Sequence, residues 1–142
     1  MNHVDTTNWK RKKGLVQRAL ATSIGRAVLE ASQDVYLEAG KNLSGPHVDV
    51  KAKKGSDPNI GKMPVPRRTG NLARALNNVP LSISLSAIFT DTNEANYDKF
   101  VHDGTRHTEP RRYLADAVTK NKQKIFNKFD KEIKSDIHKV GR

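Results

Sequence analysis

The residues of this sequence best suited to chemistry are two His–carboxylate pairs that lie close together. His102 is followed directly by Asp103, and His107 lies two residues before Glu109. Imidazole and carboxylate groups bind divalent metals and transfer protons, so a small enzyme or toxin could use His102, Asp103 and His107. Its activity would be lost on His107→Ala. Loop histidines without a fixed helical spacing are more often solvated, and we therefore expect no metal site and no enzyme.

Other catalytic and cofactor signatures are missing from the sequence. It has no cysteine, which excludes disulfides, thiolate catalysis and thiolate metal ligands. It also has no glycine-rich phosphate loop and no G-x-S-x-G nucleophile motif. No signal peptide and no run approaching ~20 apolar residues is present. We expect a soluble protein that is made in the cytoplasm, binds no cofactor and does not contact a membrane.

The net charge of +11 is unevenly distributed along the 142 residues. Residues 1–13 carry +3, residues 44–69 carry +4 and residues 111–142 carry +6, whereas residues 14–43 are neutral and residues 70–110 carry −2. Such a charge favours nucleic acid, an anionic membrane surface or an acidic protein face, or it serves solubility alone. Composition does not separate these alternatives.

Two long helices are expected near the ends of the chain, because apolar residues recur there every three or four positions. In residues 14–43 the apolar stripe consists of Val16, Leu20, Ile24, Ala27, Ala31 and Val35. In residues 111–140 it consists of Leu114, Val118, Ile125, Phe129, Ile133, Ile137 and Val140. Seven lysines cover most of the second helix: 120, 122, 124, 128, 131, 134 and 139. We expect the two helices to pack together, with these lysines in solvent or toward DNA, rather than to bind a membrane surface.

Two further basic segments flank the first predicted helix. Residues 1–13 are interpreted as a basic N-terminal arm, and residues 14–142 as one α+β domain that contains a basic loop at 44–69. A loop this long is uncommon inside a compact domain unless it binds something or becomes ordered on assembly. The candidate contacts to a neighbouring subunit or to DNA are Lys10, Arg11, Lys12, Lys13, Lys51, Lys53, Lys54, Arg67 and Arg68.

The middle of the chain predicts short elements. The alternation in residues 47–52 is typical of a short strand, and Thr69 is positioned as the N-cap of a helix at 70–77. In residues 81–89, alternate residues are apolar and serines stand between them, which predicts one strand with an apolar side and a small polar side that faces solvent or lies close to a neighbour. Pro80 suits the start of that strand.

A short helical turn should follow the strand and lead into the last helix. Tyr97, Phe100 and Val101 have helical spacing, and the turn ends at Gly104, where we expect a positive φ. Pro110 is placed to begin the final helix. These expectations give an α+β fold: two long helices at the N- and C-terminal ends, packed on a small antiparallel sheet, with a short central helix.

Three short motifs, in this order, resemble the neck or tail-completion proteins of long-tailed bacteriophages, the family of minor tail protein Z and of HK97-type head–tail joining proteins. Its members have a T-G-x-L turn, then Y-x-x-(F/Y)-V-x-x-G-T, then P-x-x-(F/Y)-L. The matching residues are Thr69, Gly70, Leu72, Tyr97, Phe100, Val101, Gly104, Thr105, Pro110, Tyr113 and Leu114, within residues 63–118. The chain departs from the pattern at His102, often Glu in the family, at Asp103, often aromatic, and in its more basic loop.

The resemblance implies a structural protein of the virion neck or tail, assembled in the host cytoplasm. It implies a homo-oligomeric ring, taken as a hexamer, that contacts other neck and tail proteins and surrounds the DNA channel, where contact with DNA would be non-specific. The alternative is a free-standing basic nucleic-acid-binding protein. That protein would bind tightly as an isolated chain and would lose affinity steeply with added salt.

Overall fold

The computed structural model describes residues 6–48, 62–67, 69–106 and 109–140. Its elements in chain order are α1 (Thr6–Asn42), α2 (Asn71–Arg74), β1 (Leu76–Ser82), β2 (Leu85–Thr90), α3 (Asp98–His102) and α4 (Tyr113–Val140). Helices α1 and α4 pack against each other, and β1 and β2 form a two-stranded antiparallel sheet. The expected α+β class is confirmed.

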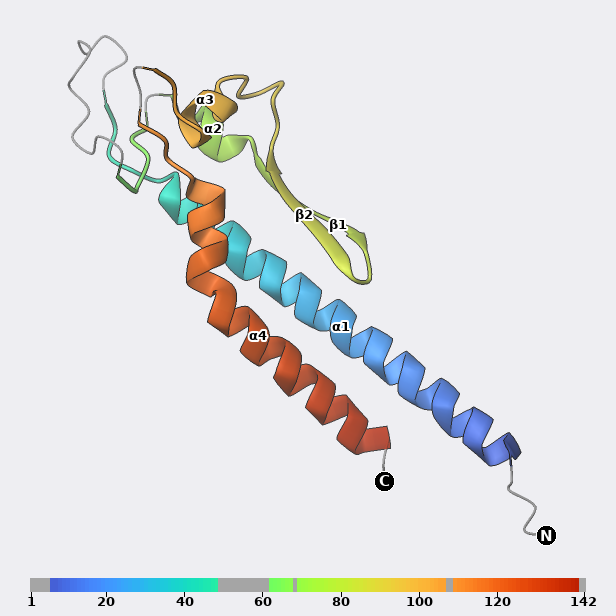
Figure 1. Cartoon of the computed structure of the whole chain (residues 1–142). Coiled ribbons are helices and arrows are strands. Elements are labelled where there is room, and N and C mark those ends of the chain that lie inside the picture. Colours follow the sequence, from blue (N-terminus) through green and yellow to red (C-terminus); the bar gives the residue numbers. More distant parts are fainter. Residues whose placement is uncertain (1–5, 49–61, 68, 107–108, 141–142) are drawn as a thin grey trace.

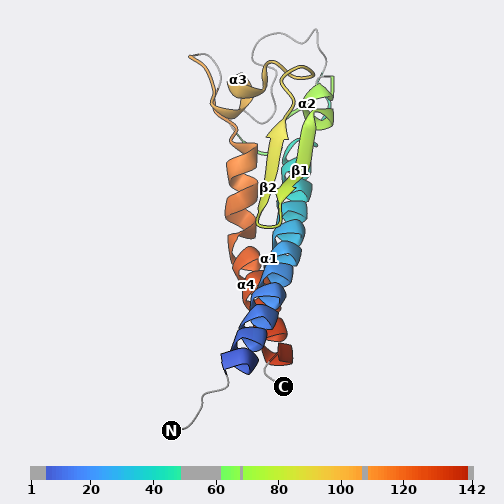
Figure 2. The same ribbon diagram turned by 90° about the vertical axis from the view of Figure 1, so that its right-hand side faces the viewer.

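The molecule is elongated along the two long helices (Figure 1). The short helices α2 and α3 and the described loops gather where α1 ends and α4 begins, and the hairpin of β1 and β2 lies alongside α1 (Figures 1 and 2). The start of α1 and the end of α4 lie at the opposite end of the helix pair. We call these two ends the loop end and the terminal end.

Helix α1 begins earlier than expected. It starts at Thr6, so residues 6–13, which we interpreted as an arm, are its first turns. Lys and Arg are good helix formers, and Gly14 weakens a helix without ending it. The expected apolar stripe is confirmed, with Ala27, Ala31 and Val35 buried.

The hydrophobic core is concentrated at the loop end. It joins the last turns of α1 to α2, the start of β1 and the start of α4. Its buried members are Val35, Ala39, Leu43, Val65, Leu72, Ala75, Leu76, Ala95, Tyr113 and Ala117. Many are alanines, which allow the helix backbones to approach closely but fill little volume. This end therefore holds the short elements in place, while the rest of the helix pair depends on other contacts.

The predicted single strand at 81–89 is wrong. A hairpin turns at Ile83 and Ser84, and β1 pairs with β2 in the register Leu76 to Thr90 and Val79 to Ala87. The strand-favouring alternation continues on both sides of a serine-rich turn, so it does not reveal the reversal. Pro80 lies inside β1, opposite Ser86 and next to an irregularity in the pairing, rather than at the strand entry.

The helix expected at 70–77 is shorter, because α2 ends at Arg74 and the chain then enters β1. Thr69 is also not its N-cap residue. That position belongs to Gly70, which has a φ of 80°, and the Thr69 hydroxyl accepts a long hydrogen bond of 3.4 Å from the Asn71 backbone N–H. A positive φ favours glycine, which explains why the turn needs Gly70.

The other turn and strand expectations have mixed outcomes. Gly104 has the expected positive φ, at 78°, and α4 begins at Tyr113, three residues after Pro110. Of the strand expected at 47–52, His47 forms an isolated parallel bridge with Arg67, and residues 49–52 lie outside the described residues.

Candidate functional site

Four of the family-motif residues share the core at the loop end, with Tyr113 at the start of α4 as the largest buried side chain. The Tyr113 hydroxyl lies 2.7 Å from the Thr90 hydroxyl and donates a hydrogen bond to the Asp98 carboxylate. The His102 ring meets the Tyr113 ring edge-on, with centroids 5.5 Å apart. Leu72 is also buried, and Val101 and Leu114 pack partly against the same core. These motif residues hold the loop end together.

Four further motif residues lie at the surface. Tyr97, Phe100, Thr105 and Pro110 are exposed.

Burial and the Asp98 carboxylate raise the pKa of Tyr113 well above its usual range, although the Thr90 hydroxyl acts in the opposite direction. The phenol therefore stays protonated and donates to Asp98, which is a structural role.

Only one of the two His–carboxylate pairs lies wholly in the described part of the chain. The Nδ1 atom of His102 lies 2.9 Å from a carboxylate oxygen of Asp103, and this contact lowers the pKa of Asp103. His107 lies outside the described residues. Within those residues, no three His, Cys, Asp or Glu side chains are grouped so that they could hold a metal ion.

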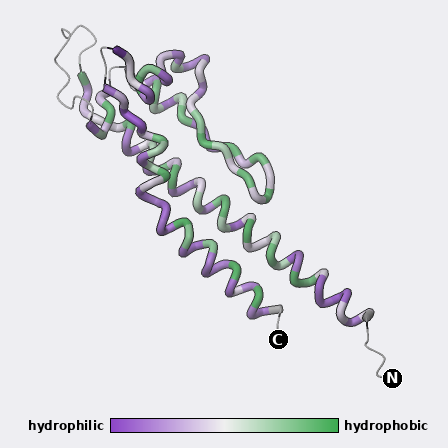
Figure 3. Tube along the Cα trace, in the orientation of Figure 1, coloured by the Kyte–Doolittle hydropathy of each residue, from purple (hydrophilic) through white to green (hydrophobic). Residues whose placement is uncertain are grey.

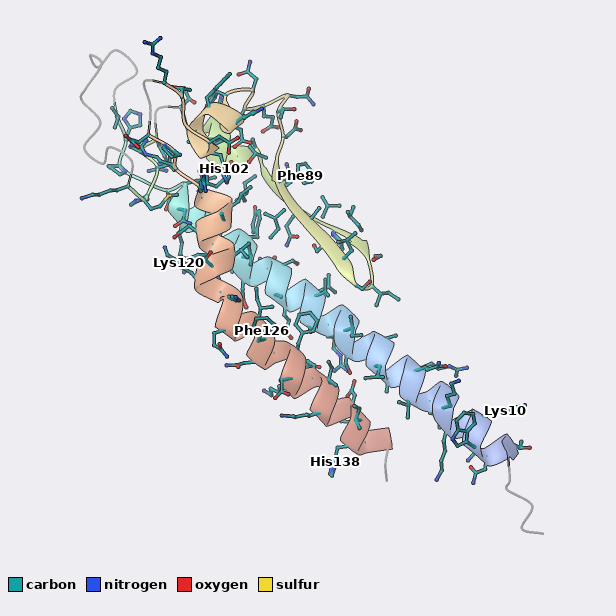
Figure 4. The ribbon with its side chains drawn as sticks, viewed as in Figure 1. Lys10, Phe89, His102, Lys120, Phe126 and His138 are labelled. Atoms are coloured by element: carbon teal, nitrogen blue, oxygen red, sulfur yellow. The ribbon has the colours of Figure 1, made fainter. Side chains whose placement is uncertain are left out.

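A ladder of ion pairs, not anticipated from the sequence, joins α1 to α4. On α1, Glu30, Asp34 and Glu38 are spaced four residues apart, and on α4 Lys120, Lys124 and Lys128 have the same spacing. The N–O distances are 3.3 Å for Lys120–Glu38, 2.9 Å for Lys124–Asp34, 2.7 Å for Lys128–Asp34 and 3.1 Å for Lys128–Glu30. Figure 4 labels Lys120 near the start of α4.

The ladder corrects the expectation that the lysines of α4 simply face solvent or DNA. Three of the seven lie against carboxylates of α1, and Lys134 and Lys139 pair with Asp130 and Asp136 of α4 itself. Partial burial raises the pKa of Asp34, but hydrogen bonds and charges from Lys128 and Lys124 outweigh it and lower the pKa overall. The same contacts raise the pKa of Lys128. The matching four-residue spacings were the signal that could have identified these pairs.

A second cluster of polar residues joins α1 to α4 nearer the terminal end. Asp136 is buried, accepts a hydrogen bond of 2.8 Å from the Ser23 hydroxyl, and lies 2.7 Å from the Arg26 guanidinium. Lys139 lies 3.1 Å from its other oxygen. Hydrogen bonds from Ser23 and Lys139, together with the charge of Arg26, lower the pKa of Asp136. This carboxylate is therefore ionised and bound across the helices.

The ion pairs define the register of the two helices. In Glu38–Lys120, Asp34–Lys124 and Arg26–Glu132 the two residue numbers add up to 158. By this rule Val140, the last residue of α4, lies opposite Arg18. The part of α1 from Thr6 to Arg18, here called the basic overhang, therefore extends about 18 Å beyond α4 at ~1.5 Å per residue. Figure 1 shows α1 continuing past the end of α4.

The basic overhang brings together four of the candidate basic residues. Lys10, Arg11, Lys12 and Lys13 are all exposed on consecutive positions of the helix (Figure 4 labels Lys10). Trp9 is 62% exposed, with the Lys13 ammonium 5.4 Å from the centre of its ring.

The remaining candidate basic residues are not part of this surface. Arg67 lies in the region of the loop end, where its Nε donates a 3.0 Å hydrogen bond to the Gly45 carbonyl. Lys51, Lys53, Lys54 and Arg68 lie outside the described residues. The described candidates therefore form two separate basic regions rather than one.

The side of the hairpin that carries Asn78 and Ser86 faces α1, and the side that carries Val79 and Phe89 faces outward. The Ser86 hydroxyl donates to the Asn78 side chain at 2.9 Å, and the Asn78 amide donates to Ser32 of α1 at 3.3 Å. The pairings Val79–Ala87 and Asn77–Phe89 place Val79 and Phe89 on the opposite side of the sheet from Asn78 and Ser86. Both apolar side chains are exposed.

Exposed apolar side chains gather on the outward side of the hairpin and at its tip, where Ile83 also contacts α1 at Gly25. We call them the hairpin face, which consists of Val79, Leu81, Ile83, Leu85 and Phe89. Leu81 is 60% exposed, Ile83 65% and Leu85 54%. Figure 3 shows the hairpin as a mostly hydrophobic segment, and Figure 4 places Phe89 on it. The sequence analysis identified Leu81, Ile83, Leu85 and Phe89 as one apolar side of a strand but did not predict that this side is exposed.

Comparison with known proteins gave no match: no family model, no curated protein and no solved structure is significantly similar to the chain. No helix in the described parts of the chain is both long and apolar enough to cross a membrane.

Proposed function

We propose that this protein is a structural subunit of the neck or tail end of a long-tailed bacteriophage. In this role it forms a homo-oligomeric ring, taken as a hexamer, that completes the tail end and joins it to the head around the DNA channel. Its partners are copies of itself and other neck and tail proteins, and its location is the virion. The motif order around Thr69, Tyr97 and Pro110 supports the choice of family.

The observation that carries an assembly role is the outward apolar side of the hairpin. A two-stranded hairpin is marginally stable in water by itself. Here it contacts α1 through the hydrogen bond of Asn78 with Ser32 and, at its tip, through Ile83, while Leu81, Leu85 and Phe89 are exposed. A contiguous exposed apolar surface of this kind marks a protein–protein contact.

A second copy of the chain offers a complementary surface. Leu29 and Leu37 of α1 and Val118 and Phe126 of α4 are also exposed apolar residues. A hairpin that docks on the helices of the next subunit makes a heterologous contact, and such contacts generate rings when the rotation closes. Burial of Leu81 and Leu85 there would contribute about 1.5–3 kcal/mol for each fully buried side chain.

The alternative of a free-standing nucleic-acid-binding protein has less support. It was based on the pI near 10 and on the lysine-rich last helix, and in that helix Lys120, Lys124 and Lys128 are engaged with carboxylates of α1. It also gives no use to the hairpin face.

A stop codon in this gene, in the phage or prophage that encodes it, tests the proposal. Electron microscopy of the lysate should show full heads beside separate tails, or tails with unfinished upper ends. Wild-type protein supplied from a plasmid should restore joined, infectious particles. Normal infectious particles without the protein would refute the neck assignment.

The same complementation tests the hairpin face. Leu85→Glu, which places a charge on the apolar surface, should fail to restore particles, whereas Ser84→Glu at the neighbouring exposed turn should restore them. Circular dichroism of the purified variants should show equal helix content. Full rescue by Leu85→Glu would remove the observation on which the assembly role depends.

A further inference from the structure

We propose that the basic overhang binds the phosphate backbone of nucleic acid without sequence preference. The inference rests on the proposed function for the identity of the polyanion, since a neck ring encloses double-stranded DNA. Its physical basis is independent of the ring and lies in the charge and geometry of α1 alone. It depends on side chains along more than three helical turns, not on the free N–H groups of the first turn.

The charge of α1 is divided along its length. From Thr6 to Leu29 the helix has no acidic residue, and its first carboxylate is Glu30. The basic overhang itself carries Lys10, Arg11, Lys12, Lys13 and Arg18. The acidic half of α1 meets the lysines of α4, whereas this basic part extends beyond the end of α4.

The positive charge of the basic overhang is not neutralised within the described chain. None of its five basic side chains forms an ion pair with a described residue, whereas Arg26, further along the same helix, binds Glu132 and Asp136. Asp136 is itself already held by Ser23, Arg26 and Lys139. A charge concentrated at one end of an elongated molecule attracts a polyanion there.

The arrangement of the charges favours nucleic acid over a membrane. Consecutive residues of a helix are about 100° apart at 3.6 residues per turn, so Lys10 to Lys13 project in every direction around the axis. A helix that lies in a bilayer surface keeps its charges on one side and its apolar residues on the other. Phosphate contacts require no such division, and they carry no sequence information.

Trp9 provides a built-in probe of this surface. It is the only tryptophan in the chain, it is well exposed, and Lys13 lies over its ring. Its fluorescence therefore reports on the basic overhang and on no other part of the protein.

The test is a titration of the purified full chain with a mixed-sequence 30-base-pair duplex, followed by anisotropy of the labelled DNA and by Trp9 emission. Arg11→Glu combined with Lys12→Glu is compared with Lys122→Glu combined with Lys131→Glu on α4. Each double variant replaces two positive by two negative charges, so both lower the net charge from +11 to +7. Both pairs are exposed, and circular dichroism should confirm equal helix content.

For the wild type we expect Trp9 emission to change on binding. A plot of the logarithm of the binding constant against the logarithm of the salt concentration should have a slope of about −4.5 for five phosphate contacts. The Arg11/Lys12 variant should bind at least tenfold more weakly, and its slope should be shallower by about 2, because two phosphate contacts are lost. The Lys122/Lys131 variant should change affinity by less than about threefold, because its charges lie away from the contact and act only through a screened field.

Three results would overturn the inference. Equal weakening by the two variants would indicate diffuse attraction, and unchanged Trp9 emission at saturating DNA would place the contact elsewhere. Tighter binding to phosphatidylserine vesicles than to duplex DNA, at equal phosphate and salt, would identify a membrane surface instead. Localised DNA binding by a chain that the phage does not need would keep this inference and refute the neck role. If the phage needs the protein for head–tail joining but both double variants weaken DNA binding equally, this inference is refuted and the neck role is kept.

Discussion

Ile83, at the tip of the hairpin, touches α1 where that helix has a glycine instead of a side chain. A Cβ atom placed on Gly25 would lie 3.2 Å from Cγ2 of Ile83 and 3.7 Å from its carbonyl oxygen. Glycine in a helix interior costs about 1 kcal/mol relative to alanine. The hairpin therefore lies close to α1 at a position where the helix itself would be more stable with a side chain.

Gly25→Ala should stabilise the protein less than the same change at Gly40, where a Cβ would meet nothing within 4 Å. Gly40→Ala should gain about 0.5–1 kcal/mol from helix propensity. At Gly25 the displaced Ile83 should cancel most of that gain. Urea unfolding of both variants measures the difference.

Ile83→Ala is the control for these substitutions. Because Ile83 is mostly exposed, its own truncation should lower the free energy of unfolding only slightly. Without the Ile83 side chain, Gly25→Ala should stabilise the protein as much as Gly40→Ala does, which the double variant Gly25→Ala/Ile83→Ala measures. Equal stabilisation at Gly25 and Gly40 in the presence of Ile83 would contradict a close contact between hairpin and helix.

Tyr113→Phe should destabilise the protein by about 1–2 kcal/mol, the cost of leaving buried polar groups without a partner. The change keeps the ring in the core but removes the hydroxyl that joins Thr90 to Asp98. Thermal or urea unfolding gives the measurement. Tyr97→Phe is the matched control, since Tyr97 lies on the surface of the same segment and should change stability by less than ~0.5 kcal/mol. Equal effects would show that the hydroxyl network contributes nothing.

Reversal of one charge in the helix–helix ladder should weaken the packing of α1 on α4. Lys128→Glu places a carboxylate beside Glu30 and Asp34. In the wild type, oxygens of these two residues lie 3.1 and 2.7 Å from the Lys128 ammonium. We expect a loss of about 1 kcal/mol or more, at the upper end of the range for partly exposed pairs. Lys122→Glu, on the same helix but exposed, is the control. The deficit should shrink in 1 M salt, and an identical melting temperature for both variants would contradict the ladder.

The long helices were predictable from the sequence because each repeats a local period over many turns. The stripe of Ala27, Ala31 and Val35 faces the partner helix as expected. Gly104 was predictable for a similar reason, since its positive φ is a local requirement of the turn. The register of α1 on α4 is a relation between two distant segments. It becomes visible only when Glu30, Asp34 and Glu38 are compared with Lys120, Lys124 and Lys128.

The orientation of the hairpin could not be obtained from alternation alone. A strand pattern gives two sides, one serine-rich and one apolar, and the pattern alone does not say which side faces the rest of the chain. Here Ser86 and Asn78 connect the polar side to Ser32, which leaves Leu85 and Phe89 outside. Under the proposed function another molecule covers this apolar side, and a rule made for single chains does not describe such a surface.

Acid should loosen the helix pair through Asp136 and Asp34, whose pKa values are both lowered in the folded protein. A carboxylate of this kind stabilises the fold fully above its ordinary pKa, near 4, and the contribution is lost as the pH falls through the lower folded value. The free energy of unfolding should therefore fall below about pH 4. The pKa of Lys128 is raised in the folded protein, so its stabilising contribution is fully present below its ordinary pKa near 10.4 and is lost only at higher pH.

Asp136→Asn removes the charge that Ser23, Arg26 and Lys139 hold between the helices. The variant should be less stable than the wild type at pH 7, and the gap should narrow toward pH 2–3 because the wild-type carboxyl is then protonated too. Urea midpoints at pH 7, 5, 4 and 3 measure this gap. Asp130→Asn is the control, because Asp130 is exposed and pairs with Lys134 one turn away on the same helix. The urea midpoint of Asp130→Asn should change with pH in parallel with that of the wild type. A difference between Asp136→Asn and the wild type that stays the same at every pH would show that the charge of Asp136 does not contribute to stability.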